Sequence, residues 1–195
     1  MIALDISNAF NTLNWESITS ELDRRKLPWK IRRLIGNYLS GRRIVVSNQQ
    51  GTVEYKVAAG VPQGSVLGSF LWNLVYDRLL ERIDNMVMVR ATTFADDLAI
   101  TCAIKRNEGA SAKVNAMLRI VNDWCASVGL KLVREKTEVM FVAGMRVPIV
   151  IGLNLGDSVV DTVEAIKYLG VMIDAHRRNL RECMVCSTEV SIIKE

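Results

Sequence analysis

The sequence predicts an α+β domain in which an antiparallel β-sheet packs against helices on one face. Short apolar runs of strand type alternate with longer segments whose apolar residues recur at helical spacing. Glycine, asparagine and aspartate separate neighbouring strand runs, which is typical of hairpins and therefore of antiparallel pairing. Of the 195 residues, 50% are hydrophobic and 24% are charged, so the chain can bury one substantial core.

The amino-terminal part predicts one strand and two helices. Residues 2–6 are a short buried strand, and residues 16–26 and 29–39 carry apolar side chains at helical spacing. Pro28 suits the first turn of the second helix, and Gly41 suits its end.

A hairpin and a long helix are expected next. Residues 43–47 and 53–58 are β-rich runs, and the loop of residues 48–51 that joins them ends in a glycine suited to a hairpin. A bend at residues 60–65, which contains two glycines and a proline, then opens onto a helix at residues 67–83.

A second predicted hairpin carries two carboxylates at its tip. Residues 86–93 and 98–103 are strand runs on either side of the polar turn Ala95-Asp96-Asp97. An amphipathic helix at residues 112–128 ends at Gly129. Further strands are expected at residues 138–142, 147–151 and 166–173, and periodicity is lost after His176.

Asp5 and the Asp96-Asp97 pair are the candidate catalytic residues. If the strands that bear them are neighbours in one sheet, their carboxylates crowd together, and cations that prefer hard oxygen ligands relieve the repulsion. Two Mg²⁺ ions at such a site support in-line nucleotidyl transfer. The alternative is a solvated hairpin turn, in which aspartate is favoured for local hydrogen bonding.

Five segments in order resemble the motif series of reverse transcriptases from non-LTR retrotransposons. They read ALDISNAFN at residues 3–11, GVPQGSVLG at 60–68, FADD at 94–97, GLKL at 129–132 with KTE at 136–138, and YLGV at 168–171. Trp15 also stands where these enzymes favour it. The resemblance implies the palm of a right-hand polymerase, which adds deoxynucleotides to a primer 3′-end as a template directs.

The resemblance also implies the metal ligands. Asp5 and Asp96 would be the main ligands, Asp97 a supporting one, and the carbonyl of Ile6 a backbone ligand. The implied cofactor is a pair of Mg²⁺ ions, with Mn²⁺ as a possible substitute. Lys136 would stabilise or protonate the pyrophosphate leaving group, although a lysine before a strand is more often merely solvated.

Nucleotide contacts are implied for Ile6, Phe10, Gln63 and Gly64. Phe10 would lie under the incoming sugar and clash with a 2′-hydroxyl, while Gln63 and Gly64 would border the nucleotide. Without the resemblance, Phe10 is a core aromatic residue and residues 60–65 are a plain turn before a helix.

The implied partners are deoxynucleoside triphosphates and an RNA or DNA template with its primer. Primer contacts are implied for Phe94, Tyr168, Leu169 and Gly170, with phenylalanine at position 94 where many relatives have tyrosine. Basic clusters at residues 24–26, 32–33 and 42–43 are either phosphate contacts or solvated faces.

Composition excludes some classes of protein. The net charge of +4 suits a polyanionic partner without requiring one, and no apolar stretch reaches the ~20 residues of a membrane span. Four irregularly spaced cysteines argue against a secreted disulfide scaffold and favour an intracellular location, in cytoplasm or nucleus. Cys183 and Cys186 with His176 fall short of a four-ligand zinc site. The sequence leaves the oligomeric state open.

Residues 1–174 are therefore expected to be a partial reverse transcriptase domain, with fingers and thumb largely missing. Residues 175–195 are expected to be a divergent or truncated tail. Two alternatives to an active reverse transcriptase stay open. One is an inactive remnant with residual nucleic-acid binding. The other is an RNA-dependent RNA polymerase, although the bulky ring of Phe10 argues against ribonucleotide use.

Overall fold

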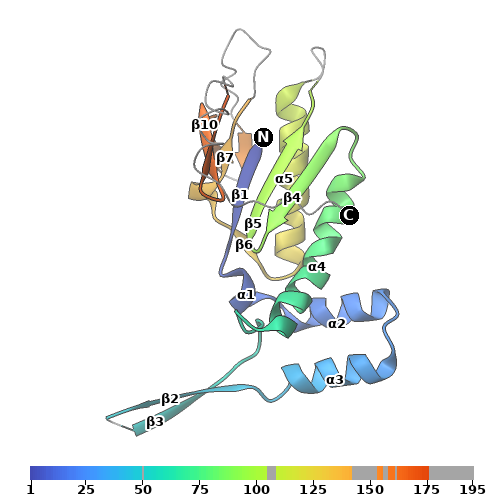
Figure 1. The fold of residues 1–195 in the computed structure, drawn as a ribbon, viewed down its shortest axis with the longest axis vertical. Coiled ribbons are helices and arrows are strands. Elements are labelled where there is room, and N and C mark those ends of the chain that lie inside the picture. The colour runs from blue at the N-terminus through green and yellow to red at the C-terminus, as the bar shows by residue number, and fades with distance from the viewer. Residues whose placement is uncertain (50, 105–108, 142–152, 156–157, 161, 176–195) are drawn as a thin grey trace, which may run out of the picture. The chain divides into compact units, whose positions relative to one another are not determined.

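The computed structural model describes residues 1–49, 51–104, 109–141, 153–155, 158–160 and 162–175 (Figure 1). The chain divides into two compact units. The sheet unit contains Met1–Asp5, Met86–Arg119 and the described residues from Leu132 onward, and the helical unit contains Ile6–Asn85 and Ile120–Lys131. Strand β1 (Ile2–Ser7) and helix α5 (Ala110–Ser127) supply residues to both units.

A five-stranded sheet with the strand order β4-β5-β1-β6, in which β7 also pairs with β1, organises the sheet unit. Besides β1, its strands are β4 (Val89–Phe94), β5 (Asp97–Cys102), β6 (Lys131–Leu132) and β7 (Glu138–Val139). Strands β4, β5 and β1 are antiparallel neighbours, with Ile2 opposite Ile100 and Leu4 opposite Leu98. These four side chains are buried, so a slip of one residue in register would expose them.

Helix α5 carries a continuous buried stripe. Its buried residues recur at spacings of one, three and four, and they are Val114, Met117, Leu118, Val121, Trp124 and Cys125. The helix stops just before Gly129, whose φ of 78° lies in the left-handed region that glycine adopts at low cost. The predicted amphipathic helix and its glycine terminus are therefore confirmed.

Two smaller hairpins follow in the sheet unit. Strand β8 (Leu153–Leu155) pairs with β9 (Ser158–Val160), and β10 (Ala165–Tyr168) pairs with β11 (Val171–Asp174). The prediction of one continuous strand over residues 166–173 was wrong. Leu169 and Gly170 take φ values of 50° and 82°, and two consecutive left-handed residues reverse the chain in a tight turn.

Four helices form most of the helical unit: α1 (Ala9–Thr12), α2 (Trp15–Arg24), α3 (Trp29–Leu39) and α4 (Val66–Asp84). Side chains cap two of them, because Asn14 accepts a hydrogen bond from the Glu16 amide and Ser65 accepts one from the Gly68 amide. The buried aliphatic residues of α2 and α4 include Ile18, Leu22, Leu71, Leu79 and Ile83.

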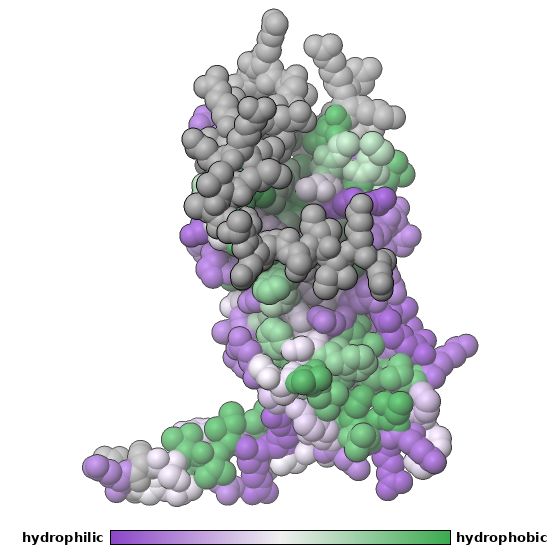
Figure 2. All heavy atoms as spheres, viewed as in Figure 1, coloured by the Kyte–Doolittle hydropathy of each residue, from purple (hydrophilic) through white to green (hydrophobic). Residues whose placement is uncertain are grey.

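The hairpin of β2 (Arg43–Asn48) and β3 (Gly51–Lys56) also belongs to the helical unit. One of its faces is apolar, because Ile44 pairs with Tyr55 and Val46 pairs with Val53. These four side chains are 49–57% exposed, and hydrophobic surface is visible along the hairpin in Figure 2.

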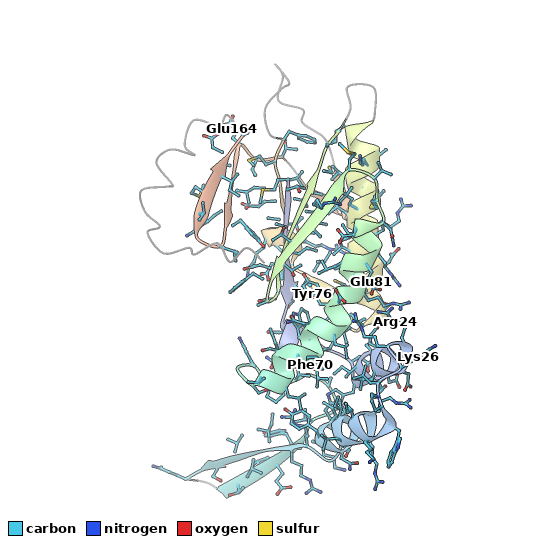
Figure 3. The ribbon with its side chains drawn as sticks, turned by 45° about the vertical axis from the view of Figure 1, so that its right-hand side comes forward. Arg24, Lys26, Phe70, Tyr76, Glu81 and Glu164 are labelled. Carbon is cyan, nitrogen blue, oxygen red and sulfur yellow. The ribbon has the colours of Figure 1, made fainter. Side chains whose placement is uncertain are left out.

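A network of ion pairs joins α2 to α4. Glu21 is only 4% exposed and receives Arg24 at 2.6 Å and Arg78 at 3.3 Å. Arg24 also reaches Glu81 of α4 at 3.2 Å, and the two labelled side chains approach each other in Figure 3. A buried carboxylate is tolerated here because two guanidinium groups neutralise it.

Some elements of the structure differ from those that the local sequence pattern predicts. The structure adds α1 and the short 3₁₀ helix η1 (Arg134–Lys136), which the sequence did not predict, and β7 is shorter than the strand expected at residues 138–142. The strand expected at residues 147–151 and the tail from His176 lie outside the described residues. Within the described part of the chain, no helix has the length and apolar character needed to cross a membrane.

Candidate active site

The predicted carboxylates meet at one end of the central sheet. Asp5 lies near the end of β1 and is the direct cross-strand partner of Asp97, the first residue of β5. Phe94 pairs with Asp97 across the β4–β5 hairpin, so Ala95 and Asp96 form its two-residue connection. The antiparallel register thus brings together residues that are more than ninety positions apart in sequence.

The connection itself is strained. Ala95 has a φ of 54°, a left-handed conformation that costs an alanine about 1–2 kcal/mol. Such strain persists where the surrounding pairing fixes the backbone, and it is common at functional sites. Residue identity alone does not reveal a backbone φ, so the sequence gives no signal that Ala95 is strained.

Crowding of the carboxylates is evident in their electrostatics. Partial burial, Asp96 and Asp5 together raise the pKa of Asp97 above its ordinary value of 3.8, while the positive charge of Lys136 opposes them. The negative charges of its two neighbours disfavour the ionised form of Asp97. The carboxylates at the tip of the hairpin therefore repel one another, and a bound cation would reduce this repulsion.

Lys136 supplies a cation within the chain. Its Nζ donates a hydrogen bond to Oδ2 of Asp5 at 2.5 Å, across 131 residues of sequence. This bond and the charge of Asp5, with smaller contributions from Asp96 and Asp97, raise the pKa of Lys136 above its ordinary value. The structure thus places Lys136 beside the carboxylates, as its predicted role requires.

The donor set suits a hard divalent cation. Three carboxylates and backbone carbonyls are oxygen ligands of the kind that Mg²⁺ prefers. The side chain of Ile6 is a hydrocarbon without a donor atom, so its backbone carbonyl is the group it can offer a metal. Among the described residues, however, no three His, Cys, Asp or Glu side chains are arranged as they stand to hold a metal ion.

Two of the predicted primer contacts lie near the carboxylates. Phe94 is 65% exposed and stands opposite Asp97 in the hairpin. Tyr168 donates a hydrogen bond to the Thr92 carbonyl at 3.4 Å, and burial and the charge of Asp97 raise its pKa. Leu169 and Gly170 form the turn that follows Tyr168, with Leu169 49% exposed.

The helical unit joins the first and second motifs to each other. The Val61 amide donates to the Phe10 carbonyl at 2.6 Å, and the Gly60 amide donates to the Leu13 carbonyl at 2.8 Å. Trp15 closes the contact, because its indole nitrogen donates to the Gly60 carbonyl at 2.8 Å. The motifs that carry Phe10 and Gln63 are therefore tied together by backbone hydrogen bonds.

The predicted nucleotide-contact residues of this unit differ in their exposure to solvent. The ring of Phe10 is half-buried and packs on Trp72 with centroids 5.3 Å apart. From there an aromatic row continues through Tyr76 to Trp124. Gln63 and Gly64 are exposed, and Gly64 has a φ of 80°. Phe10 is thus both a packing residue and partly accessible.

Most arginines of the three basic clusters already have partners. Arg24 and Arg25 pair with acidic residues of α4, Arg32 pairs with Asp23, and Arg43 pairs with Glu54. Arg42 lies over the ring of Tyr38, 5.3 Å from its centroid. These contacts favour the simpler interpretation of the clusters, in which they stabilise helix and hairpin surfaces.

Comparison with known proteins gives a consistent result. The family model described as "Reverse transcriptase (RNA-dependent DNA polymerase)" matches residues 1–173. A putative 115 kDa protein of the type-1 retrotransposable element R1DM of Drosophila melanogaster is 32% identical, over 93% of this chain and 18% of that protein. The probable RNA-directed DNA polymerase from transposon X-element of the same fly is 30% identical, over 88% of this chain and 19% of that protein.

Solved structures agree at the level of fold. Apo telomerase from Candida tropicalis superposes with a TM-score of 0.64 and 12% identity, over 89% of this chain and 31% of the telomerase chain. A version of that telomerase truncated from its C-terminal domain gives a TM-score of 0.61 over 89% of this chain and 33% of that one. The chain spans less than a fifth of the length of the two retrotransposon relatives above. It belongs to the reverse transcriptase family, with the fold of a right-hand polymerase and with relatives among the RNA-directed DNA polymerases of non-LTR retrotransposons.

Proposed function

We propose that residues 1–174 are the palm of an RNA-directed DNA polymerase that extends a primer 3′-end with deoxynucleotides on an RNA or DNA template. One observation carries the proposal, namely the register that sets Asp5 opposite Asp97 with Asp96 in the adjoining turn. A site of this kind inside the cell would use two Mg²⁺ ions, or Mn²⁺ in their place. Residues 175–195 would be a tail outside the palm.

The carboxylates would hold the metal ions. Asp5 and Asp96 would be the main ligands, with Asp97 and the Ile6 carbonyl in support. When bound, the ions would supply charge neutralisation for the triphosphate and would lower the pKa of the primer hydroxyl. Lys136, already beside Asp5, would offer its ammonium group to the negative charge that develops on pyrophosphate.

Three residues of the helical unit would select and border the nucleotide. The contact with Trp72 supports the ring of Phe10, so the ring would resist displacement by a 2′-hydroxyl on the incoming sugar. Gln63 and Gly64 are exposed and would lie against the nucleotide. The primer would meet Phe94, Tyr168, Leu169 and Gly170, all of which belong to the unit that carries the carboxylates.

Primer extension tests this proposal. The purified chain would be given a poly(A) template, an oligo(dT) primer, thymidine triphosphate and Mg²⁺, and compared with Asp96→Ala and with Asp84→Ala at the end of α4 as a matched control. We expect the first substitution to abolish extension, because it removes a main metal ligand, and the second to leave extension unchanged. Extension that survives Asp96→Ala would refute the assigned role.

The same assay separates the alternatives. An RNA polymerase would prefer uridine triphosphate over thymidine triphosphate, whereas Phe10 should enforce the reverse preference and Phe10→Ala should relax it. A catalytically inactive remnant would show no extension while still binding the primer–template duplex. The pairing of Asp5 with Lys136 is compatible with that alternative, because it neutralises one carboxylate without a metal.

A further inference from the structure

Backbone contacts on both sides of Lys136 position it beside Asp5. Its turn, η1, starts from Val133, whose amide donates to the Asp5 carbonyl at 2.9 Å. After the turn, Glu138 pairs with Ala3 of β1, and Thr137 fastens the turn internally by donating to the Val133 carbonyl at 3.1 Å. Both ends of the segment are thus tied to the strand that bears Asp5.

The two partners differ in how freely they can move. The side chain of Asp5 is 17% exposed, whereas that of Lys136 is 68% exposed. A lysine has four rotatable bonds, and its ammonium can leave Oδ2 of Asp5 for solvent without any change in the backbone. Asp5 cannot leave in the same way, because it is fixed within the sheet. Any exchange of cations at this carboxylate therefore requires the lysine to move.

An ammonium and a divalent metal compete for the same negative charge. Lys136 contacts Asp5, and the charges of Asp96 and Asp97 also favour its ammonium form; these three side chains would ligate the metal. A divalent ion at these carboxylates would repel the ammonium across a few Å, and it would also require oxygen lone pairs that the ammonium now engages. The two cations therefore compete for Oδ2 of Asp5.

We propose that Lys136 is a built-in counter-ion that occupies the carboxylate site in the metal-free protein, and that a divalent cation must displace its ammonium from Asp5 to bind. The inference rests on the proposed function, since it takes the three aspartates to be the metal site. In this role Lys136 acts before any chemical step, by neutralising Asp5. The lysine keeps the carboxylates compatible with a folded, metal-free chain, and it weakens metal binding by competition.

Metal affinity measured without substrate tests this directly. Binding of Mn²⁺ would be followed by electron paramagnetic resonance, and of Mg²⁺ by calorimetry, for the unmodified chain, Lys136→Met and Lys136→Arg. Lys113→Met is the matched control, because Lys113 of α5 belongs to the same unit but donates to the Ala103 carbonyl. Circular dichroism would establish that each variant is folded.

We expect Lys136→Met to bind Mn²⁺ roughly tenfold more tightly, with Lys136→Arg and Lys113→Met close to the unmodified chain. In the unmodified chain, nuclear magnetic resonance should show the ¹⁵Nζ signal of Lys136 moving toward that of a solvated lysine as Mg²⁺ is added. Equal or weaker metal binding by folded Lys136→Met would overturn the counter-ion role while leaving the metal site intact. Absence of saturable binding in every variant would instead overturn the metal site, and the counter-ion role with it.

Discussion

Gly60 is the position where the structure makes the sharpest prediction about stability. It is buried with a φ of 82°, and a Cβ added there would lie 2.4 Å from the carbonyl oxygen of Asn11 and 2.6 Å from its carbonyl carbon. Real Cβ contacts essentially never fall below 3.0 Å, so in Gly60→Ala the backbone around residue 60 would have to move away from Asn11. This movement would break the hydrogen bonds that join the first and second motifs.

The expected cost follows from these contacts. A left-handed alanine costs about 1–2 kcal/mol, and each of two or three lost hydrogen bonds costs about 1 kcal/mol, giving about 3–5 kcal/mol for Gly60→Ala. Gly64 is the matched control, because it has a φ of 80° but nothing within 4 Å of an added Cβ. Gly64→Ala should therefore cost only the conformational part, about 1–2 kcal/mol.

Urea unfolding followed by tryptophan fluorescence measures both variants. Trp15 and Trp72 belong to the unit concerned, so their emission reports its unfolding. The midpoint for Gly60→Ala should lie well below that for Gly64→Ala. If the two variants lose equal stability, the close approach to Asn11 is not what requires glycine at position 60.

Three further predictions concern other parts of the chain. Gly36→Ala, in the middle of α3 with open space around the added Cβ, should raise the free energy of unfolding by about 0.5–1 kcal/mol in urea titrations, and a loss would contradict the assigned helix. Because the pKa of Asp97 is raised in the folded protein, the folded state binds more protons than the unfolded state near pH 3.8. The unfolding free energy relative to Asp97→Asn should therefore decline as pH rises from there through the native pKa. A difference in unfolding free energy that does not change with pH would refute this. Finally, Ile44→Thr combined with Val46→Thr should reduce self-association in light scattering by removing exposed apolar surface from the β2–β3 hairpin, whereas Val45→Thr on its opposite face should not.

Local sequence patterns determined most elements of the fold. Apolar periodicity predicted α2, α3, α4 and α5 within a few residues, and turn residues predicted both hairpins that follow α3 and α4. These predictions succeeded because helix and hairpin signals depend on neighbours within four residues. The order of the five motifs likewise identified the family from the sequence, and the family match over residues 1–173 confirmed it.

Features that depend on one or two backbone angles were not predictable in the same way. The run at residues 166–173 has strand composition throughout, yet two left-handed residues divide it into β10 and β11. Similarly, nothing in the composition of residues 9–12 distinguishes the short helix α1 from a loop. Short elements of this kind are fixed by tertiary contacts, because their local preference is too weak to decide.

By itself the sequence determined which residues are candidates for the chemistry: the carboxylates at positions 5, 96 and 97, and the lysine at 136. Only the tertiary structure decided that Asp5 stands opposite Asp97, that Lys136 pairs with Asp5, and that most of the basic clusters are neutralised by acidic neighbours. The physical reason is that charge interactions act through space and weaken with distance, with salt screening them over about 10 Å. Their partners are chosen by strand register and helix packing, which bring together residues that lie far apart along the chain.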